Sequence, residues 1–300
     1  MIDGISLDQL RTFVAAADEG SFSAAGRRLK RTQSAVSESM ANLEAQLGVI
    51  LFDRRGRYPR LTTEGGVLLA DARAVVGGVD CMKARAKGIS GGLEAELTAV
   101  IDVFFPIDAM AGVAREFSTH FPSTPLRLYV EALGGAVQPV LDGRASFGIV
   151  GSLPTLPVGL MAEHVASVKF VMVAATQHPL AAHRGLIPRD ELARHVQLVL
   201  TDRSDLSAGR EFGVMSPSTW RLADLFAKHA FLVSGLGWGG MPMHTVEREI
   251  AEGRLVELSI QDIPSGGLQV PMLAVYRVSA PPGPAGRWVI ERLKQCANEQ

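Results

Sequence analysis

The chain has 300 residues, of which 47% are hydrophobic and 20% are charged, and its formal net charge is −1 at pH 7. This length suits two domains or one large one, and the apolar content is enough to build full cores. The near-neutral charge excludes a polycation. Because no apolar run approaches the ~20 residues of a bilayer-spanning helix and no leader-like segment opens the chain, we expect a cytoplasmic protein with no membrane partner.

Charge is unevenly distributed along the chain. Residues 23–60 contain eight basic and three acidic side chains, a local charge of +5, which leaves −6 for the remainder. A basic head on an acidic body suits contact with nucleic acid at one end only, although a solvated charged face is the simpler explanation of charge alone. The two cysteines, Cys81 and Cys296, fit a reducing compartment, and no motif around them supports a redox pair.

Short helices are predicted at the start of the chain. Ser6 and Gln9 form a capping box before apolar residues at helical spacing, and Gly20 ends this first helix. Ser21 or Ser23 begins a second helix, which a basic turn separates from a third. This order of elements predicts a helix-turn-helix, the motif that lays its second helix in a DNA groove.

The third predicted helix begins at Thr32 and has two different faces. Its core face carries apolar residues spaced by four, three and four positions, namely Val36, Met40, Leu43 and Leu47. Its other face begins with short amide and hydroxyl side chains at Gln33, Ser34 and Ser37, which can approach base edges and phosphates. An ordinary solvated helix face is the alternative interpretation of these residues.

A basic hairpin is predicted after the third helix, with short strands at 51–52 and 58–61. Three arginines lie at its tip: Arg54, Arg55 and Arg57. Such a wing can enter the minor groove or bind phosphates. The helices, their caps and the wing together are more specific than any one of them.

The head resembles the LysR-type transcriptional regulators. The residues that carry the resemblance are Phe13, 21–25, 33–37, Leu43, Glu44, Leu47, Gly48, Leu51, Phe52, Arg54, Leu61, Thr62 and Gly65. Gly26 departs from the alanine often found in the family, and we expect it to weaken its helix by ~1 kcal/mol. The predicted DNA contacts are Ser23, Thr32, Gln33, Ser34, Ser37, Arg54, Arg55 and Arg57.

Residues 63–92 are predicted to form a linker helix with an apolar seam. The seam residues alternate at spacings of four and three: Leu68, Ala72, Val75, Val79, Met82, Ala86 and Ile89. Pairing with a second copy would bury this stripe, and packing on the chain's own body is the alternative. The resemblance favours a homodimer on half-sites a whole number of helical turns apart, and it leaves tetramers and contact with RNA polymerase open.

The pattern changes to alternating strands and helices over residues 93–300, which predicts an α/β body. The expected strands are 97–104, 126–131, 147–150, 168–174, 196–200, 231–233, 255–258 and 273–278. The expected helices are 109–121, 137–141, 222–228, 246–252 and 288–296. The resemblance here is looser and depends on residues 235–238, Pro242 and 253–256, whereas Ser146 stands where many members have aspartate.

The resemblance implies that the body is a two-lobed α/β domain like the periplasmic binding proteins, with an effector between the lobes. Ligands of open α/β sheets bind outside the carboxyl ends of strands. This rule selects as effector contacts Phe105, Pro106, Ile107, Leu133, Gly134, Val150, Thr201, Asp202, Arg203 and Ser234. Phe105 and Ile107 suggest a partly apolar or aromatic effector, and Arg203 suits a carboxylate. Ordinary strand-end residues are the alternative.

Enzymatic motifs give weaker interpretations. Gly235, Gly237 and Gly240 follow the predicted strand 231–233 as G-x-G-x-x-G, the outline of a dinucleotide-binding turn. Pro242 and the short remaining chain oppose that interpretation and favour a tight turn between strand and helix. We find no metal-ligand spacing, nucleophile elbow or phosphate-binding loop, so we expect no metal, no cofactor and no catalytic residues.

The sequence therefore predicts a mixed α/β chain with a winged helix-turn-helix head over 1–62, a linker and dimerisation helix over 63–92, and a two-lobed effector domain over 93–300. The predicted function is regulation of transcription by double-stranded DNA binding under control of a small molecule. Two alternatives stay open: a regulator whose body acts through protein contacts without a ligand, and an enzyme whose helix-turn-helix only docks to a partner.

Overall fold

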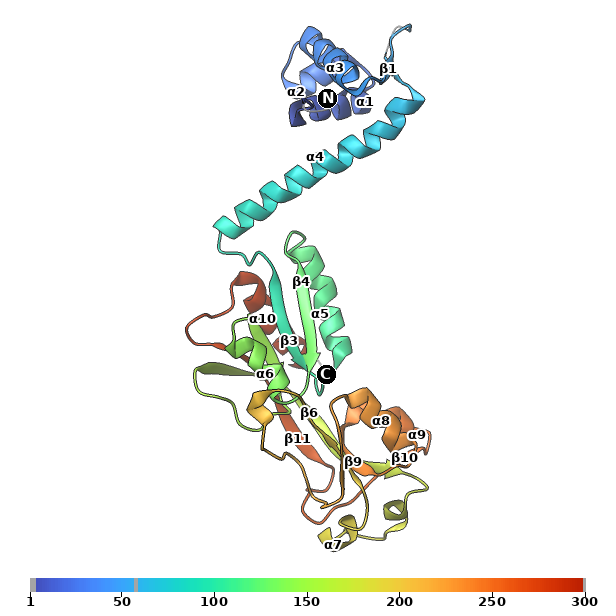
Figure 1. The fold of residues 1–300 in the computed structure, drawn as a ribbon, viewed down its shortest axis with the longest axis vertical. Helices are drawn as coiled ribbons and strands as arrows, with labels where there is room; N and C mark the ends of the chain where they lie inside the picture. Colours follow the sequence, from blue (N-terminus) through green and yellow to red (C-terminus); the bar gives the residue numbers. More distant parts are fainter. Residues whose placement is uncertain (1–3, 57–58, 299–300) are drawn as a thin grey trace. The chain divides into compact units, whose positions relative to one another are not determined.

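The computed structural model describes residues 4–56 and 59–298. The chain divides into two compact units, Met1–Lys87, with the head and most of the long helix α4, and Gly88–Gln300, the body (Figure 1).

The three helices of the head begin at hydrogen-bonded caps. They are α1 (Leu7–Glu19), α2 (Phe22–Leu29) and α3 (Gln33–Leu47). The Ser21 hydroxyl accepts the amide of Ala24 at 3.0 Å, so Ser21 and not Ser23 caps α2. The Thr32 hydroxyl accepts the amide of Ala35 at 3.2 Å and caps α3. Local sequence therefore fixes where each helix starts.

Aromatic packing and one glycine set how the head helices cross. The ring of Phe52 meets Phe13 and Phe22 edge to face, with centroids 5.7 and 5.3 Å apart. A Cβ on Gly26 would lie 2.7 Å from the carbonyl oxygen of Arg31. The expectation that Gly26 only weakens α2 is therefore incomplete, because the turn after α2 passes too close for a side chain at this position.

The wing is a two-stranded antiparallel ribbon, and α4 follows it. Its strands are β1 (Phe52–Asp53) and β2 (Arg60–Leu61), shorter than the segments expected from the sequence. Helix α4 spans Thr63–Ser90, and a Cβ on Gly65 in its first turn would lie 2.3 Å from the carbonyl oxygen of Leu51. The start of α4 is therefore packed closely against the chain that leads into the wing.

The predicted seam of α4 divides into two parts. Ala72 is buried in the core of the head and Leu68 packs against that core. Val75 and Met82 are 51% and 63% exposed, and Ala86 is exposed. The expectation of one continuous seam for a partner is therefore wrong for Leu68 and Ala72, which the head itself covers.

A continuous mixed sheet forms the centre of the body. Its strand order is β4-β3-β5-β11-β6-β9-β7-β8, and β10 pairs with β6. The strands are β3 (Leu97–Asp102), β4 (Leu126–Glu131), β5 (Phe147–Val150), β6 (Leu160–Ala175), β7 (Gln197–Leu200), β8 (Thr219–Leu222), β9 (Trp238–Pro242), β10 (Leu255–Glu257) and β11 (Leu268–Arg277). The helices are α5 (Ile107–His120), α6 (Gly134–Leu141), α7 (Arg189–Leu192), α8 (Leu225–Val233), α9 (Glu247–Ala251) and α10 (Pro284–Asn298).

Alternating side chains place helices on both faces of this sheet. In β3, Ala99 and Ile101 join the core that α5 and α10 cover, whereas Val100 joins the core beneath α6. In β6, Val171 and Val173 face the α8 side and Met172 the opposite side. This period of two in buried strands produces a three-layer arrangement in each half of the body.

Two long strands connect the halves of the body. Strand β6 pairs with β11 over 160–170 and with β9 and β10 over 170–175, so it leaves the first lobe and enters the second. Strand β11 returns the chain to β5 of the first lobe. The body therefore has two lobes joined by an antiparallel pair of crossing strands (Figure 1).

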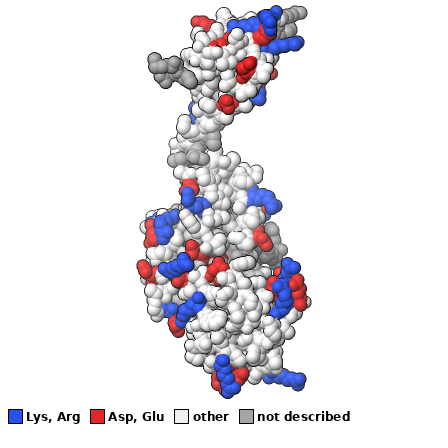
Figure 2. All heavy atoms as spheres, turned by 45° about the vertical axis from the view of Figure 1, so that its right-hand side comes forward, with Lys and Arg blue, Asp and Glu red and all other residues white. Residues whose placement is uncertain are grey.

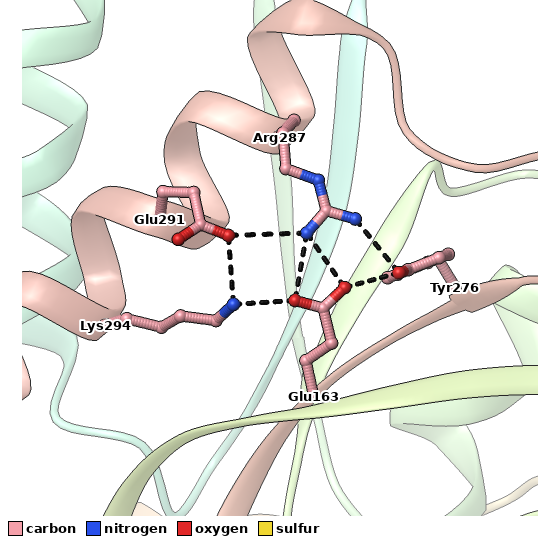
Figure 3. Close-up of polar contacts among 5 residues, drawn as sticks. All are labelled: Glu163, Tyr276, Arg287, Glu291 and Lys294. Carbon is pink, nitrogen blue, oxygen red and sulfur yellow. Dashed lines mark hydrogen bonds and ion pairs between the residues drawn. The ribbon is translucent and has the colours of Figure 1, made fainter.

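An ionic network ties the crossing strands to α10 (Figure 3). Glu163 on β6 accepts hydrogen bonds from Arg287 at 2.8 Å and from Lys294 at 2.6 Å, and the hydroxyl of Tyr276 on β11 also donates to it. Glu291 contacts both cations. Hydrogen bonds from Lys294, Tyr276 and Arg287 lower the pKa of the Glu163 carboxyl from 4.5 to about 2, against the opposing effect of burial.

The second lobe differs from the sequence expectation mainly over residues 219–242. Residues 231–233 are the last turn of α8 and not a strand, so Ser234 follows a helix. Gly239 and Gly240 lie within β9, and Thr219–Leu222 forms a strand that the pattern did not predict. The order is helix, turn, strand, which is the reverse of a dinucleotide-binding turn. The misassignment arose because the apolar end of α8 has no helical periodicity to separate it from a buried strand.

Candidate functional sites

The first turn of α3 presents an accessible polar surface. Thr32, Gln33 and Ser34 are exposed, and Ser37 is partly buried one turn later. The first turn contains no acidic residue, so the partial positive charge of the helix N-terminus is not neutralised there. Ser23, at the start of α2, is exposed and accepts a hydrogen bond from Arg27 at 3.2 Å. Such a surface can approach the phosphates and base edges of a duplex.

The two described wing arginines are already paired within the head. Arg54 donates to Glu44 at 2.6 Å and lies over the ring of Phe22 at 5.4 Å, while Glu44 also accepts the amides of Leu51 and Phe52. Arg54 therefore helps to attach the wing to α3. Arg57 lies outside the described residues.

Arg55 is held differently. Its side chain is 91% exposed and makes a bidentate pair with Asp53. Hydrogen bonds from Arg55 lower the pKa of the Asp53 carboxyl from 3.8 to about 2. An exposed pair of this kind contributes little to stability and can exchange partners with a phosphate.

A cavity of about 150 Å³ lies between the two lobes of the body. Leu133, Phe104 and Ser152 line it from the first lobe, and Phe170, Leu200 and Lys228 are among the residues that line it from the second. The rings of Phe104 and Phe170 have centroids 4.9 Å apart. The walls are mostly apolar, as expected for a small-molecule site.

Asp102, at the end of β3, organises the first-lobe side of this cavity. Its buried carboxylate accepts hydrogen bonds from the amides of Phe104 (3.0 Å), Gly151 (3.0 Å) and Ser152 (2.8 Å), and from the Ser152 hydroxyl (2.6 Å). Burial raises the pKa of the Asp102 carboxyl, against the opposing effect of these hydrogen bonds. Asp102 therefore fixes the loops after β3 and β5 by satisfying their buried amides.

The two lobes also meet at the N-terminus of α6. Leu133 has a φ of 50°, which is unusual for a side chain of this size, and its amide donates to Ser152 at 2.7 Å. The amide of Gly135 donates to the carboxylate of Asp202 at 2.7 Å, and that of Gly134 to the hydroxyl of Ser207 at 3.2 Å. Groups from the second lobe therefore bind the first turn of a first-lobe helix.

Of the effector contacts predicted from the sequence, some line the interlobe cavity or a neighbouring hollow and the others do not. Leu133 lines the cavity, and it also borders a second hollow lined in part by Thr201, Asp202 and Arg203. The others do not line the cavity: Phe105, Pro106, Ile107, Gly134, Val150 and Ser234. Phe105 is buried in the main core, whereas Ile107 is 54% exposed at the start of α5. Ser234 is the C-cap of α8, so the strand-end rule does not apply to it.

Lys228, the ionisable residue of the cavity lining, was not selected from the sequence. It lies in α8, is 3% exposed and donates from its ammonium to the carbonyl oxygen of Gly240 at 2.8 Å. Burial lowers its pKa from 10.5 to about 7. The available signal was the single lysine of a largely apolar helix, because lysine is rarely fully buried without a reason.

Most other charges of the body lie at its surface in pairs. Figure 2 shows basic and acidic side chains next to one another over the visible face of the body. Pairs such as Arg127–Glu96 and Arg189–Asp262 account for part of this pattern. Within the described ranges, no group of three or more His, Cys, Asp or Glu residues is placed to hold a metal ion, and no helix is long and apolar enough to cross a membrane.

Two protein families match this chain. Residues 7–66 match the bacterial regulatory helix-turn-helix proteins of the lysR family, and residues 90–297 match the LysR substrate binding domain. The chain is 28% identical over 303 residues to the probable HTH-type transcriptional regulator YhaJ of Escherichia coli (strain K12), covering 98% of this chain and 97% of YhaJ. It is 29% identical over 251 residues to the HTH-type transcriptional regulator PunR of the same organism, covering 83% and 81%.

Solved structures share the fold. A cysteine mutant of OxyR from Corynebacterium glutamicum superposes with a TM-score of 0.58 at 22% identity, covering 98% of this chain and 93% of that one. A cysteine variant of full-length OxyR from Pseudomonas aeruginosa gives 0.51 at 21% identity, covering 98% and 99%. The polar helix of the head, the two-lobed body and these matches agree: the chain belongs to the LysR family and is a DNA-binding transcriptional regulator with an effector-binding domain, not an enzyme.

Proposed function

We propose that the N-terminal turn of α3 reads base edges in the major groove. The observation that carries this proposal is the exposed polar surface of Thr32, Gln33 and Ser34 at the N-terminus of a 15-residue helix with no acid in its first turn. Gln33 suits bidentate bonding to adenine, and Ser37 suits a base or phosphate contact one turn later. Ser23, at the N-terminus of α2, suits a backbone phosphate.

The wing contributes to affinity more than to sequence preference in this proposal. Arg55 exchanges Asp53 for a phosphate, since its present pair is exposed. Arg54 acts first by holding the wing against Glu44, so that its phosphate contact is secondary. Arg57 remains a predicted phosphate contact.

A homodimer formed through α4 suits the exposed part of the seam. Val75 and Met82 are more than half exposed in the single chain, and Ala86 lies further along the same seam. A second α4 packed there buries them and gives a two-fold pair of heads on a partly palindromic site. Pairing of dimers into tetramers and contact with RNA polymerase are further steps of the same proposal, in a cytoplasmic setting.

The body acts as a sensor of a small molecule in the interlobe cavity. The crossing strands β6 and β11 allow the lobes to change their relative placement, and a ligand that contacts both lobes favours one placement over another. That preference is transmitted through α4 to the spacing of the paired heads.

Selection of duplexes from random DNA by the full-length protein tests the proposal. We expect an enriched site with two half-sites and a salt-dependent affinity. Gln33→Ala is expected to lose base discrimination at one position per half-site by about 1–3 kcal/mol, and Ser37→Ala to shift preference more weakly. Gln261→Ala, an exposed glutamine of the body, is the matched control. Unchanged preference in both head variants would remove the assignment of α3 as the base-reading element.

A further inference from the structure

The ammonium of Lys228 has no ionic partner in the part of the chain that the structure describes. Among the described residues it makes one hydrogen bond, to the carbonyl oxygen of Gly240 at 2.8 Å, and it forms no ion pair with a carboxylate. An ammonium carries three N–H donors, and a buried charge without a counter-ion is costly. The large fall in its pKa on burial expresses this cost. A partner that supplies negative charge and accepts hydrogen bonds would therefore be strongly stabilised beside it.

The other polar side chains of the cavity wall, Gln197 and Ser152, already make hydrogen bonds within the protein. Gln197 donates to the carbonyl of Gly213 at 2.7 Å and accepts two backbone amides. The hydroxyl of Ser152 donates to Asp102 and accepts the amide of Leu133. Lys228 is the only ionisable side chain in the lining. A ligand in this cavity thus meets one ionisable group, the ammonium of Lys228.

The size and walls of the cavity restrict the remainder of the ligand. The lining includes Phe104, Phe170, Met172, Leu198 and Phe212, and the volume is about 150 Å³. An apolar protein cavity of about this size accepts benzene. A second charged group would be left without a counter-charge in this wall, which penalises dicarboxylates and zwitterions.

From these observations we infer that the interlobe cavity binds a small monocarboxylate with an apolar body no larger than about one phenyl ring, and that the ammonium of Lys228 holds its carboxylate. The inference rests on the proposed sensing function and specifies its ligand class. Lys228 belongs to the second lobe and Phe104 to the first, so a ligand anchored by its charge on one lobe packs its apolar body against the other. This arrangement gives the ligand contacts that depend on lobe placement.

The test uses the full-length protein and acids matched with their neutral amides. The probes are phenylacetate, hexanoate and 4-methylpentanoate with phenylacetamide, hexanamide and 4-methylpentanamide. Ligand binding is measured by the shift of the unfolding midpoint and by tryptophan fluorescence, which reports the body because Trp220, Trp238 and Trp288 are the only tryptophans. We expect at least one acid to bind the wild type more tightly than its amide.

Lys228→Met removes the charge while keeping most of the apolar stem. We expect it to weaken the acid on the order of 10- to 100-fold and to leave or improve binding of the amide, so that the selectivity reverses. A merely structural lysine would not change the acid-to-amide ratio. Lys169→Met removes a partly exposed lysine of β6 and is the matched control. Lys228→Gln serves the same purpose if the methionine variant does not fold.

Three results would overturn the inference: no acid binds, the amides bind the wild type better, or Lys228→Met retains the acid. DNA selection on the same samples separates this failure from failure of the proposed function. Amides that bind and alter the selected spacing would leave sensing intact and remove only the ligand class. Loss of DNA selection by the wild type would instead contradict the proposed function.

Discussion

One exposed ion pair of the head and two buried ionisable groups of the body show opposite uses of charge. In the head, Arg55 is almost fully exposed and is paired with Asp53 in water. In the body, Asp102 and Lys228 are almost completely buried, and only Asp102 has its hydrogen bonds satisfied by the chain. Solvent screening makes an exposed ion pair weak and exchangeable. Burial makes an ionisable group costly unless it has a partner, so its hydrogen bonds have a large effect on stability or binding. Exposed charges therefore suit reversible binding of a polyanion. Buried charges suit stabilisation of the fold or binding of a specific ligand.

The largest effect is expected from Asp102. Asp102→Ala leaves three backbone amides, two of them fully buried, and the Ser152 hydroxyl without their acceptor, so we expect the body to lose about 3–5 kcal/mol of unfolding free energy. Denaturant unfolding followed by tryptophan fluorescence measures this loss. The matched control is Asp262→Ala, which removes an exposed carboxylate paired with Arg189 and should change stability by less than about 1 kcal/mol. Equal effects of the two variants would contradict the distinction between buried and surface charge.

Glu163 lies between these extremes, and its effect depends on pH. Its pKa is lowered from 4.5 to about 2 in the folded chain, so its contribution is present above pH 4.5 and is lost as the pH falls from about 4.5 to about 2. At neutral pH, Glu163→Gln should destabilise the body by about 2 kcal/mol, because Arg287 and Lys294 lose the negative charge that they share and one of its two acceptor oxygens.

The difference between wild type and Glu163→Gln should therefore shrink as the pH is lowered through this range. Glu257→Gln is the control, since Glu257 is more exposed and its distance to Lys169 is 4.0 Å. A difference that stays constant between pH 5 and pH 2 would show that the ionised network is not what the substitution removes.

Short-range patterns predicted the head well for a physical reason. The capping box at Ser6, the cap at Thr32 and the glycine at Gly20 act within three or four residues, so the sequence displays them directly. The steric role of Gly26 was not predictable, because the contact arises only when the turn after α2 folds back on the helix.

The body depends on long-range contacts, and its site was harder to predict. The strand-end rule selected Leu133, which lines the cavity, and Asp202, which lines a separate hollow, because the rule is a property of parallel strands in any open sheet. It missed Lys228, which reaches the cavity from the middle of a helix, and it misplaced Ser234 because the apolar last turn of α8 has the pattern of a short buried strand. Tertiary packing, and not the local sequence pattern, determines both the position of Lys228 at the cavity and the helical conformation before Ser234.

The smallest effect is expected from the exposed pair in the wing. Asp53→Asn keeps an oxygen that can accept the amide of Arg55 but removes the negative charge that neutralises its guanidinium. We expect affinity for a non-specific duplex to rise by less than about ten-fold and the dependence of log K on log salt to steepen by about one, because Arg55 becomes available to a phosphate. Sequence preference should not change. Asp142→Asn is a close control, since Asp142 makes the same kind of exposed pair with Arg144 two residues on, in the body. If both variants raise affinity equally, net charge and not the release of Arg55 accounts for the gain, and the wing loses its role as a phosphate contact.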